Sequence, residues 1–221
     1  MGLLARRKEE LEAVAREILD GGGRVAVLPV DVARREAVHD AVAEAEDLLG
    51  PVDLLVANAG KKLPTSPGHV SADDVEAVLK VNFMGAVHAV EAVLPGMRAR
   101  GDGQLSCVSS IAAFGGLPGA AAYGASKAAL TNYFEALRIE LRGSGVDVTV
   151  LSPGFVRTPM TGDKANRRPF LMERDDAVEK MLRAILARRR AHTFPWPLAA
   201  LARAGRLLPR SMYDAILGSR R

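Results

Sequence analysis

The amino-acid sequence predicts an α/β fold in which helices cover both faces of a doubly wound parallel sheet. Valine-rich apolar runs of strand length recur along the chain, and they alternate with longer stretches whose apolar residues are spaced three and four apart. Strands that alternate with helices in this way pair in parallel and are buried on both faces. A chain of 221 residues suits one domain, so we assign residues 1–221 to a single unit.

Each predicted element follows from its local sequence. The predicted strands are residues 24–30, 52–57, 104–109 and 146–151, and Gly2-Leu3-Leu4 has the character of the end of a further strand. The predicted helices are residues 8–20, 34–49, 72–100, 122–142 and 174–190. Ser71 followed by Asp74 suits a helix start, and Gly101 suits the end of the same helix.

Composition and charge narrow the class of protein. The chain is 48% hydrophobic and 25% charged, as in a soluble globular protein, and its net charge is +4. We attribute the excess of basic residues to a solvated surface that also suits a phosphorylated cofactor, because no nucleic-acid-binding motif accompanies it. The sequence therefore predicts no nucleic-acid partner.

Two features predict a cytoplasmic location. The one cysteine, Cys107, lies in an apolar run and has no partner for an internal disulfide, which fits a reducing compartment. No secretory leader is recognisable, and no apolar stretch reaches the roughly 18 residues of a membrane span. We expect Cys107 to be a core residue, and we expect no metal ligands in the site.

Polar and glycine residues follow the predicted strands at their carboxyl ends. They are Asp31-Val32, Asn58-Ala59-Gly60, Ser109-Ser110 and Ser152-Pro153-Gly154. Because the crossovers of one parallel sheet are right-handed, these loops gather at one edge of the sheet, where ligands bind in such folds. We expect the active site at that edge.

Tyr123 and Lys127 form the strongest chemical pattern. They are four residues apart on a predicted helix, so the ammonium lies near the phenol on one face. A nearby cation favours the phenolate and lowers the tyrosine pKa from about 10 toward neutral pH, as proton transfer requires. The pair alone is common on helix surfaces, but here Ser110, at the end of a strand, precedes Tyr123 by thirteen positions.

With these residues the chain resembles the short-chain dehydrogenase/reductase family, in which serine, tyrosine and lysine occur in this order and spacing. The resemblance extends over nearly the whole chain and includes residues 56–60, 81–85 and 152–158. It implies a Rossmann-like fold and an NAD(P)-dependent oxidoreductase that interconverts a carbonyl and an alcohol by hydride transfer.

The resemblance implies a role for each catalytic candidate. Tyr123 would protonate the carbonyl oxygen as hydride arrives, and Ser110 would orient and polarise that oxygen, with Ser109 as the rival assignment. Lys127 would hold the nicotinamide ribose and lower the tyrosine pKa. Asn82 would keep a water in a proton relay, or would instead satisfy buried backbone groups in its helix.

The resemblance also assigns the cofactor contacts. Asp31 and Val32 would lie near the adenine, Asn58, Ala59 and Gly60 along the adenosine ribose, and Pro153, Gly154, Val156 and Thr158 beside the nicotinamide and pyrophosphate. Arg6 and Arg7 stand where an NAD-preferring site carries an acidic residue, and guanidinium groups suit a 2′-phosphate, so NADP(H) is favoured over NAD(H). The alternative is a basic helix start without a ligand.

The family's opening strand, glycine-rich turn and first helix do not occur in the sequence. A family member would have roughly 30 further residues before Met1, the size of one βα unit with its lead-in. Without this unit we expect the strands at residues 2–4 and 24–30 to lose a neighbour, with weakened stability and cofactor affinity. A misassigned start and a truncated, degenerate relative are both open, and the intact motifs favour the first.

The C-terminal part, residues 159–221, is expected to select the substrate through a lid over residues 159–175 and a tail from His192. The apolar spacing of the tail suits a hydrophobic or lipid-like substrate, packing on its own domain, or a membrane contact that we do not favour. By resemblance, helices 72–100 and 122–142 would form a homodimer or homotetramer. The competing function is a non-catalytic scaffold or oligomer partner.

Overall fold

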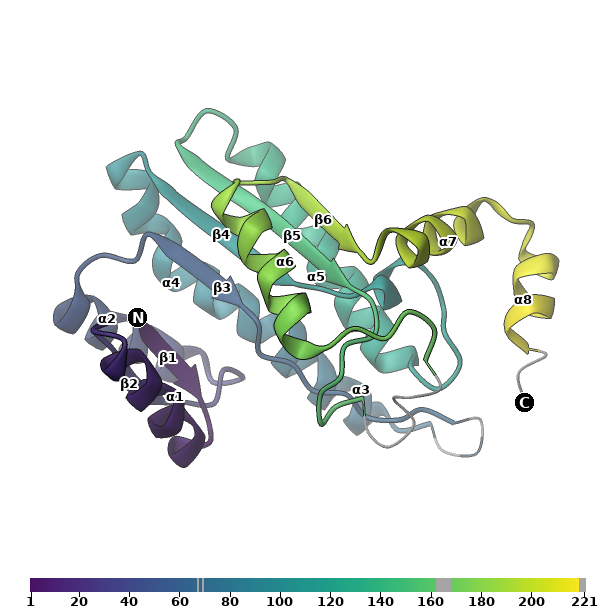
Figure 1. Ribbon diagram of the computed structural model, residues 1–221, viewed down its shortest axis with the longest axis horizontal. Coiled ribbons are helices and arrows are strands. Elements are labelled where there is room, and N and C mark those ends of the chain that lie inside the picture. The colour runs from purple at the N-terminus through teal and green to yellow at the C-terminus, as the bar shows by residue number, and fades with distance from the viewer. Residues whose placement is uncertain (67, 69, 162–167, 219–221) are drawn as a thin grey trace.

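Helices flank both faces of parallel strands in the computed structural model, which describes residues 1–66, 68, 70–161 and 168–218 (Figure 1). The strands are β1 (Gly2–Ala5), β2 (Ala26–Pro29), β3 (Leu54–Ala57), β4 (Gly103–Val108), β5 (Val146–Pro153) and β6 (Ala191–Phe194). The helices are α1 (Lys8–Asp20), α2 (Arg35–Leu49), α3 (Ala72–Leu79), α4 (Gly85–Arg100), α5 (Ala121–Glu140), α6 (Arg174–Leu186), α7 (Trp196–Leu207) and α8 (Arg210–Gly218). The predicted fold class is confirmed.

The strands form two sheets. β1 pairs in parallel with β2, while β3, β4, β5 and β6 pair in parallel in that order. The expectation that the strand at residues 24–30 loses a neighbour is wrong, because β2 lies against β1 with Gly2 opposite Ala26. Among the described residues β1, β2, β3 and β6 are end strands, and each has one edge without a strand partner.

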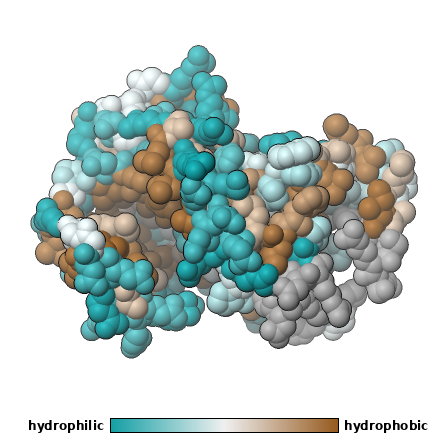
Figure 2. Space-filling model, in the orientation of Figure 1, coloured by the Kyte–Doolittle hydropathy of each residue, from teal (hydrophilic) through white to brown (hydrophobic). Residues whose placement is uncertain are grey.

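The unpaired edge of β3 has a measurable effect on burial. Leu54 and Val56 of β3 are each 42% exposed, whereas Leu105 and Cys107 of the neighbouring β4 are completely buried. Figure 2 shows apolar surface, in brown, beside the N-terminal sheet at the lower left. Valine and leucine in a strand of a parallel sheet are normally buried on both faces, so β3 lacks part of its usual cover.

One hydrophobic core joins the two sheets through their helices. α2 packs on α4, and Val38 of α2 and Val90 of α4 are almost fully buried in the same cluster as Leu105 of β4. In Figure 1, α4 and α5 lie behind the larger sheet and α6 lies in front of it. Cys107 is a buried core residue as expected, and burial raises the pKa of its thiol to about 12.

The segment of residues 72–100 departs from expectation in two ways. It is long and apolar enough to cross a membrane by length and composition, although we expected no such stretch. Its buried residues, among them Val93 and Met97, belong to the core of this fold, as in the central helix of a globular protein. A π-helical turn at Lys80–Met84 also joins α3 to α4. Such turns inside α-helices often mark functional positions.

The C-terminal region contains a strand that sequence patterns did not predict. β6 has only four residues and a polar centre at His192 and Thr193, so no apolar run marks it. The tail then packs on its own domain, where Leu198 is buried and the Tyr213 hydroxyl donates to the Gly116 carbonyl at 2.9 Å. On the outer face of the tail Trp196 is 78% exposed, and Figure 2 shows apolar surface over α7 and α8.

Candidate active site

The carboxyl ends of β3 and β4 meet α5 and the π-helical turn at one place. Lys127 of α5 donates from Nζ to the carbonyl oxygen of Val108, the last residue of β4, at 2.7 Å. A Cβ atom placed on Gly60, after β3, would lie 3.8 Å from Lys127 Nζ and 3.9 Å from Asn82 Oδ1. The structure thus brings together Gly60, Asn82 and Lys127, which the sequence placed in three separate motifs.

Lys127 is a buried ammonium group. The residue is 3% exposed, and burial is the main reason that its pKa falls from 10.5 to about 8. The described residues offer it one hydrogen-bond acceptor, the Val108 carbonyl, and an ammonium has three donors. Two N–H groups therefore remain for hydroxyl groups of a ligand, which fits the ribose contact expected of a nicotinamide cofactor.

Tyr123 lies beside Lys127, but its pKa does not move in the expected direction. The Lys127 Nζ is 5.9 Å from the centroid of the Tyr123 ring. Burial raises the pKa of the phenol, and a hydrogen bond with Ser110 partly opposes the rise. The physical reason is that desolvation of the phenolate is the larger effect, while the Lys127 ammonium donates to a backbone carbonyl.

The two serines after β4 differ in what they contact. The Ser109 hydroxyl lies 3.1 Å from the Lys127 carbonyl oxygen and 2.6 Å from the Thr131 hydroxyl, so its hydrogen-bonding capacity is used inside the fold. Ser110 caps the 3-10 turn at Ile111–Phe114, where its Oγ accepts from the Ala112 N–H at 3.1 Å, and it is also the serine that contacts Tyr123. This geometry supports Ser110, whose catalytic role stays a prediction.

Asn82 occupies the π-helical turn and is 1% exposed. Its Oδ1 accepts from the Lys61 N–H at 2.6 Å, and its Nδ2 donates to the Lys61 carbonyl at 2.9 Å and to Ser126 Oγ at 2.8 Å. The side chain therefore satisfies buried backbone groups, which is the alternative that the sequence left open. It does so for the loop after β3 instead of for its own helix, and its place in a proton relay stays a prediction.

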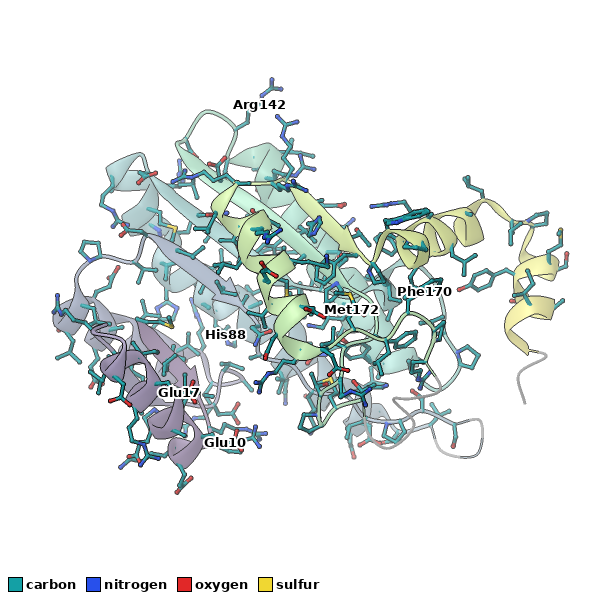
Figure 3. The ribbon with its side chains drawn as sticks, viewed as in Figure 1. Glu10, Glu17, His88, Arg142, Phe170 and Met172 are labelled. Carbon is teal, nitrogen blue, oxygen red and sulfur yellow. The ribbon has the colours of Figure 1, made fainter. Side chains whose placement is uncertain are left out.

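The loop after β2 is fixed against α4. Asp31 Oδ1 accepts from the Ala33 N–H at 3.0 Å, which forms the turn, and the Val32 carbonyl lies 3.0 Å from His88 Nδ1. His88 is labelled on α4 in Figure 3. A Cβ on Gly85 would lie 2.7 Å from Val32 Cγ2, so only glycine permits this close approach. Asp31 and Val32 thus have defined positions at the sheet edge.

The remaining cofactor candidates lie at the surface of the same edge or next to it. Asn58, Ala59 and Gly60 are exposed after β3, and Pro153, Gly154, Val156 and Thr158 are half-buried at and after the end of β5. The Gly154 N–H donates to the Phe194 carbonyl at 2.7 Å. Val156 forms a bridge to Met172, which joins the chain just before the lid to the end of the lid. Residues 162–167 of the lid lie outside the described residues.

Arg6 and Arg7 are exposed between β1 and α1. Arg7 forms an ion pair with Glu10 at 2.6 Å, as a basic residue at a helix start does without any ligand. No ion pair of Arg6 occurs within the described part of the chain. The two arginines are therefore not equivalent, and Arg6 is the better candidate for a phosphate contact.

Sequence reasoning missed two basic residues at this edge of the sheet, one of them near Tyr123. The Lys62 Nζ is 6.0 Å from the Tyr123 ring centroid, and the Arg168 guanidinium carbon is 5.0 Å from the centroid of Phe155. Burial and, after it, the charge of Arg168 lower the pKa of Lys62. The run Lys61-Lys62 directly after Gly60 was the only sequence feature that could have indicated the first of them.

The fold and the site together define an α/β oxidoreductase with a tyrosine and a lysine at the carboxyl edge of its sheet. The family model described as short chain dehydrogenase matches residues 1–169. The chain therefore belongs to the short-chain dehydrogenase/reductase family of oxidoreductases.

Individual relatives agree with this assignment. An uncharacterized oxidoreductase of Myxococcus xanthus is 40% identical over 210 residues, which cover 95% of this chain and 83% of the relative. A short-chain dehydrogenase/reductase of Burkholderia phymatum in complex with NAD has a TM-score of 0.81 and 24% identity, over 91% of this chain and 82% of that one. A gluconate 5-dehydrogenase of Burkholderia cenocepacia in complex with NADP and tartrate has a TM-score of 0.78 and 23% identity, over 90% of this chain and 85% of that one. The two structures show the shared fold.

Proposed function

We propose that this chain interconverts a carbonyl and an alcohol on a hydrophobic or lipid-like substrate with NADP(H), using Tyr123 as the acid and base. The observation that carries the proposal is the position of Lys127, whose buried ammonium lies 5.9 Å from the Tyr123 ring centroid; the Ser110 hydroxyl, which lowers the tyrosine pKa against the effect of burial, supports it. The family supplies the class of reaction, and NADP and NAD are both found among its structural neighbours.

Each residue of the site has a separate role in the reduction of the carbonyl group. The nicotinamide cofactor supplies the hydride when bound. Tyr123 gives its phenolic proton to the substrate oxygen as that oxygen gains negative charge, and Ser110 donates a hydrogen bond to the same oxygen. The raised pKa keeps the phenol protonated at neutral pH, which suits the reduction direction. The positive charge of Lys127 then stabilises the phenolate that remains.

Cofactor preference is attributed to Arg6. Its guanidinium is exposed after β1 and suits the 2′-phosphate that distinguishes NADP(H) from NAD(H). We expect the chain to bind NADPH at least tenfold more tightly than NADH in a calorimetric titration, and Arg6→Glu to remove the difference. Arg142→Glu, a charge change on an exposed residue after α5, is the matched control. Equal affinity for both cofactors in the unmodified chain would contradict this assignment.

A non-catalytic scaffold is the second candidate function. The observation that favours it is the divided sheet, in which β1 and β3 have unpaired edges beside the cofactor loops. This reading predicts that the 221-residue chain binds neither cofactor and oxidises no NADPH with a panel of ketones and aldehydes. Any turnover that depends on Tyr123 rules it out.

We also propose that the protein is a cytoplasmic homodimer or homotetramer. A cavity on the side of α5 that faces away from the sheet is lined by small and aromatic residues, including Ala129, Tyr133 and Ala136 of α5 and Phe83. Such a surface suits a second copy of the helix. Sedimentation velocity of the chain and of Ala129→Arg tests it: a dimer or larger that dissociates in the variant supports the proposal, and a monomer in both contradicts it.

A further inference from the structure

A second ammonium group lies beside Tyr123 and has no part in the mechanism above. The Lys62 Nζ is 6.0 Å from the Tyr123 ring centroid, almost the same distance as the Lys127 Nζ at 5.9 Å. Lys127 is buried, whereas Lys62 is an exposed residue whose ammonium group is only partly shielded from solvent. Lys62 is therefore the ammonium group near Tyr123 that is more accessible to solvent.

The backbone that carries Lys62 is held in place. The preceding residue, Lys61, is bound through both its N–H and its carbonyl by the buried side chain of Asn82, at 2.6 and 2.9 Å. A lysine on a fixed backbone has fewer positions available than one on a free loop. This restriction suits a group that recognises a ligand.

Arg168 is a further positively charged residue at this edge of the sheet. Its guanidinium carbon is 5.0 Å from the Phe155 ring centroid, and Phe155 follows β5 at the sheet edge that carries the site. Burial is the main cause of the lowered pKa of Lys62, and the positive charge of Arg168 contributes to it.

No carboxylate among the described residues forms an ion pair with Lys62 or Arg168. Positive charges that share one region without a counter-charge repel each other, and an anion bound near them lowers this cost. The arrangement therefore favours a negatively charged ligand group next to the phenol.

We propose that Lys62 and Arg168 form an anion subsite beside Tyr123, and that the substrate bears a carboxylate or phosphate group that binds there while its carbonyl meets Tyr123. The proposal rests on the proposed function and narrows its substrate class to an amphiphile with an anionic head. The other source of an anion is a phosphate of the cofactor, and the experiment separates the two sources.

The test compares charged and neutral substrates of the same length. A set of oxodecanoates with the ketone at successive positions, and their methyl esters, are assayed with NADPH in the unmodified chain, Lys62→Met, Lys62→Arg and Arg142→Met. We expect Lys62→Met to raise KM for the best oxodecanoate by about 10- to 100-fold, the loss of one charge-assisted contact. The KM for its ester and the Kd for NADPH should change by less than about threefold, and Lys62→Arg should retain most of the preference.

Arg142→Met is the control for the loss of one positive charge. Arg142 is labelled at the top of the molecule in Figure 3, away from Met172, which bridges to Val156 of the site. An equal KM increase for acid and ester in Lys62→Met would overturn the subsite. So would a change confined to the Kd for NADPH, which would place a cofactor phosphate there, or a fall in kcat for both substrates, which would place Lys62 in proton transfer.

A second measurement does not need turnover. Calorimetric titration of the corresponding hydroxydecanoate and its methyl ester reports whether the chain discriminates the charged product, and whether Lys62→Met abolishes that discrimination. Equal binding of acid and ester would contradict the anion subsite but would leave the proposed function intact. Failure of every carbonyl compound to oxidise NADPH contradicts the proposed function, even where the acid binds preferentially.

Discussion

Replacing Lys127 with methionine should abolish activity and yet make the protein more stable at neutral pH. The lysine is 3% exposed and carries its charge into the interior, which is why its pKa falls to about 8. Methionine has a similar length without the charge, so it fills the same space. Active-site groups that are held in unfavourable surroundings commonly show this trade between stability and function.

The size of the effect follows from the pKa and from one hydrogen bond. A fall from 10.5 to about 8 corresponds to about 3 kcal/mol of cost for keeping the ammonium charged in the folded state, at about 1.4 kcal/mol per pH unit. The variant also loses the bond from Nζ to the Val108 carbonyl, which stabilises the folded state by about 1–2 kcal/mol. We expect a net gain of about 1–2 kcal/mol in the free energy of unfolding at pH 7.

The pH dependence identifies the lysine as the cause. Below pH 8 it is charged in both the folded and the unfolded states, and the cost is present in full. Between pH 8 and 10.5 the folded state releases the proton while the unfolded state keeps it, so the stability contribution of Lys127 rises with pH. Burial raises the pKa values of Cys107 and Tyr123, which favours their neutral forms and lowers stability at high pH. Because both groups occur in both proteins, the difference between the proteins isolates Lys127.

The assay is urea unfolding, followed by circular dichroism, of the unmodified chain and Lys127→Met at pH 7, 8 and 9. The advantage of the variant should be largest at pH 7 and should shrink toward pH 9. A variant that is less stable than the unmodified chain at pH 7, or an advantage that stays constant with pH, would refute the reasoning from burial.

Three further predictions concern backbone conformation, buried hydrogen bonds and the divided sheet. Gly145→Ala should lower the free energy of unfolding by about 3 kcal/mol or more, because its Cβ would lie 1.7 Å from the Gly101 carbonyl oxygen. Gly143→Ala, which has a similar positive φ but open space around it, should lower it by about 1–2 kcal/mol in the same thermal unfolding assay. Equal losses in the two variants would count against the contact with Gly101. Asn82→Ala should lower the free energy of unfolding by about 2–4 kcal/mol, because it leaves the backbone of the loop after β3 without its hydrogen bonds. The control Asn132→Ala, at an exposed position, should change it by less than about 0.5 kcal/mol, and calorimetric melting checks both values. In hydrogen exchange the amides of β3 should exchange faster than those of β4, which has a strand on each side, and equal protection would indicate that the free edge of β3 is covered in solution.

Much of the larger sheet could be predicted because its strands are apolar runs between long amphipathic helices. β4 and β5 fall within one or two residues of the predicted bounds, and the helix that carries Tyr123 and Lys127 was placed within two residues. The topology also predicted that the ends of β3 and β4 lie at one edge, and Lys127, which donates to the Val108 carbonyl at the end of β4, approaches Gly60 after β3. These features depend on local pattern and on chain connectivity, which a sequence contains.

Other features depend on packing that no local pattern encodes. β6 exists because β5 offers it an edge, although its centre at His192 and Thr193 is polar. The pKa of Tyr123 depends on the extent to which surrounding residues exclude water, which spacing along a helix does not give. Lys62 comes near Tyr123 because the side chain of Asn82, 20 residues further along the chain, holds the loop before it.

Turnover by two tyrosine variants tests the central claim most directly. NADPH oxidation is measured with the best carbonyl substrate for the unmodified chain, Tyr123→Phe and Tyr133→Phe, the last being a tyrosine of the same helix that contacts Phe83 and Phe134. The proposed mechanism predicts that Tyr123→Phe lowers kcat by about 10²- to 10⁴-fold with an unchanged Kd for NADPH, whereas Tyr133→Phe retains activity. Activity of Tyr123→Phe within about threefold of the unmodified chain would contradict the assignment of Tyr123 as the proton donor.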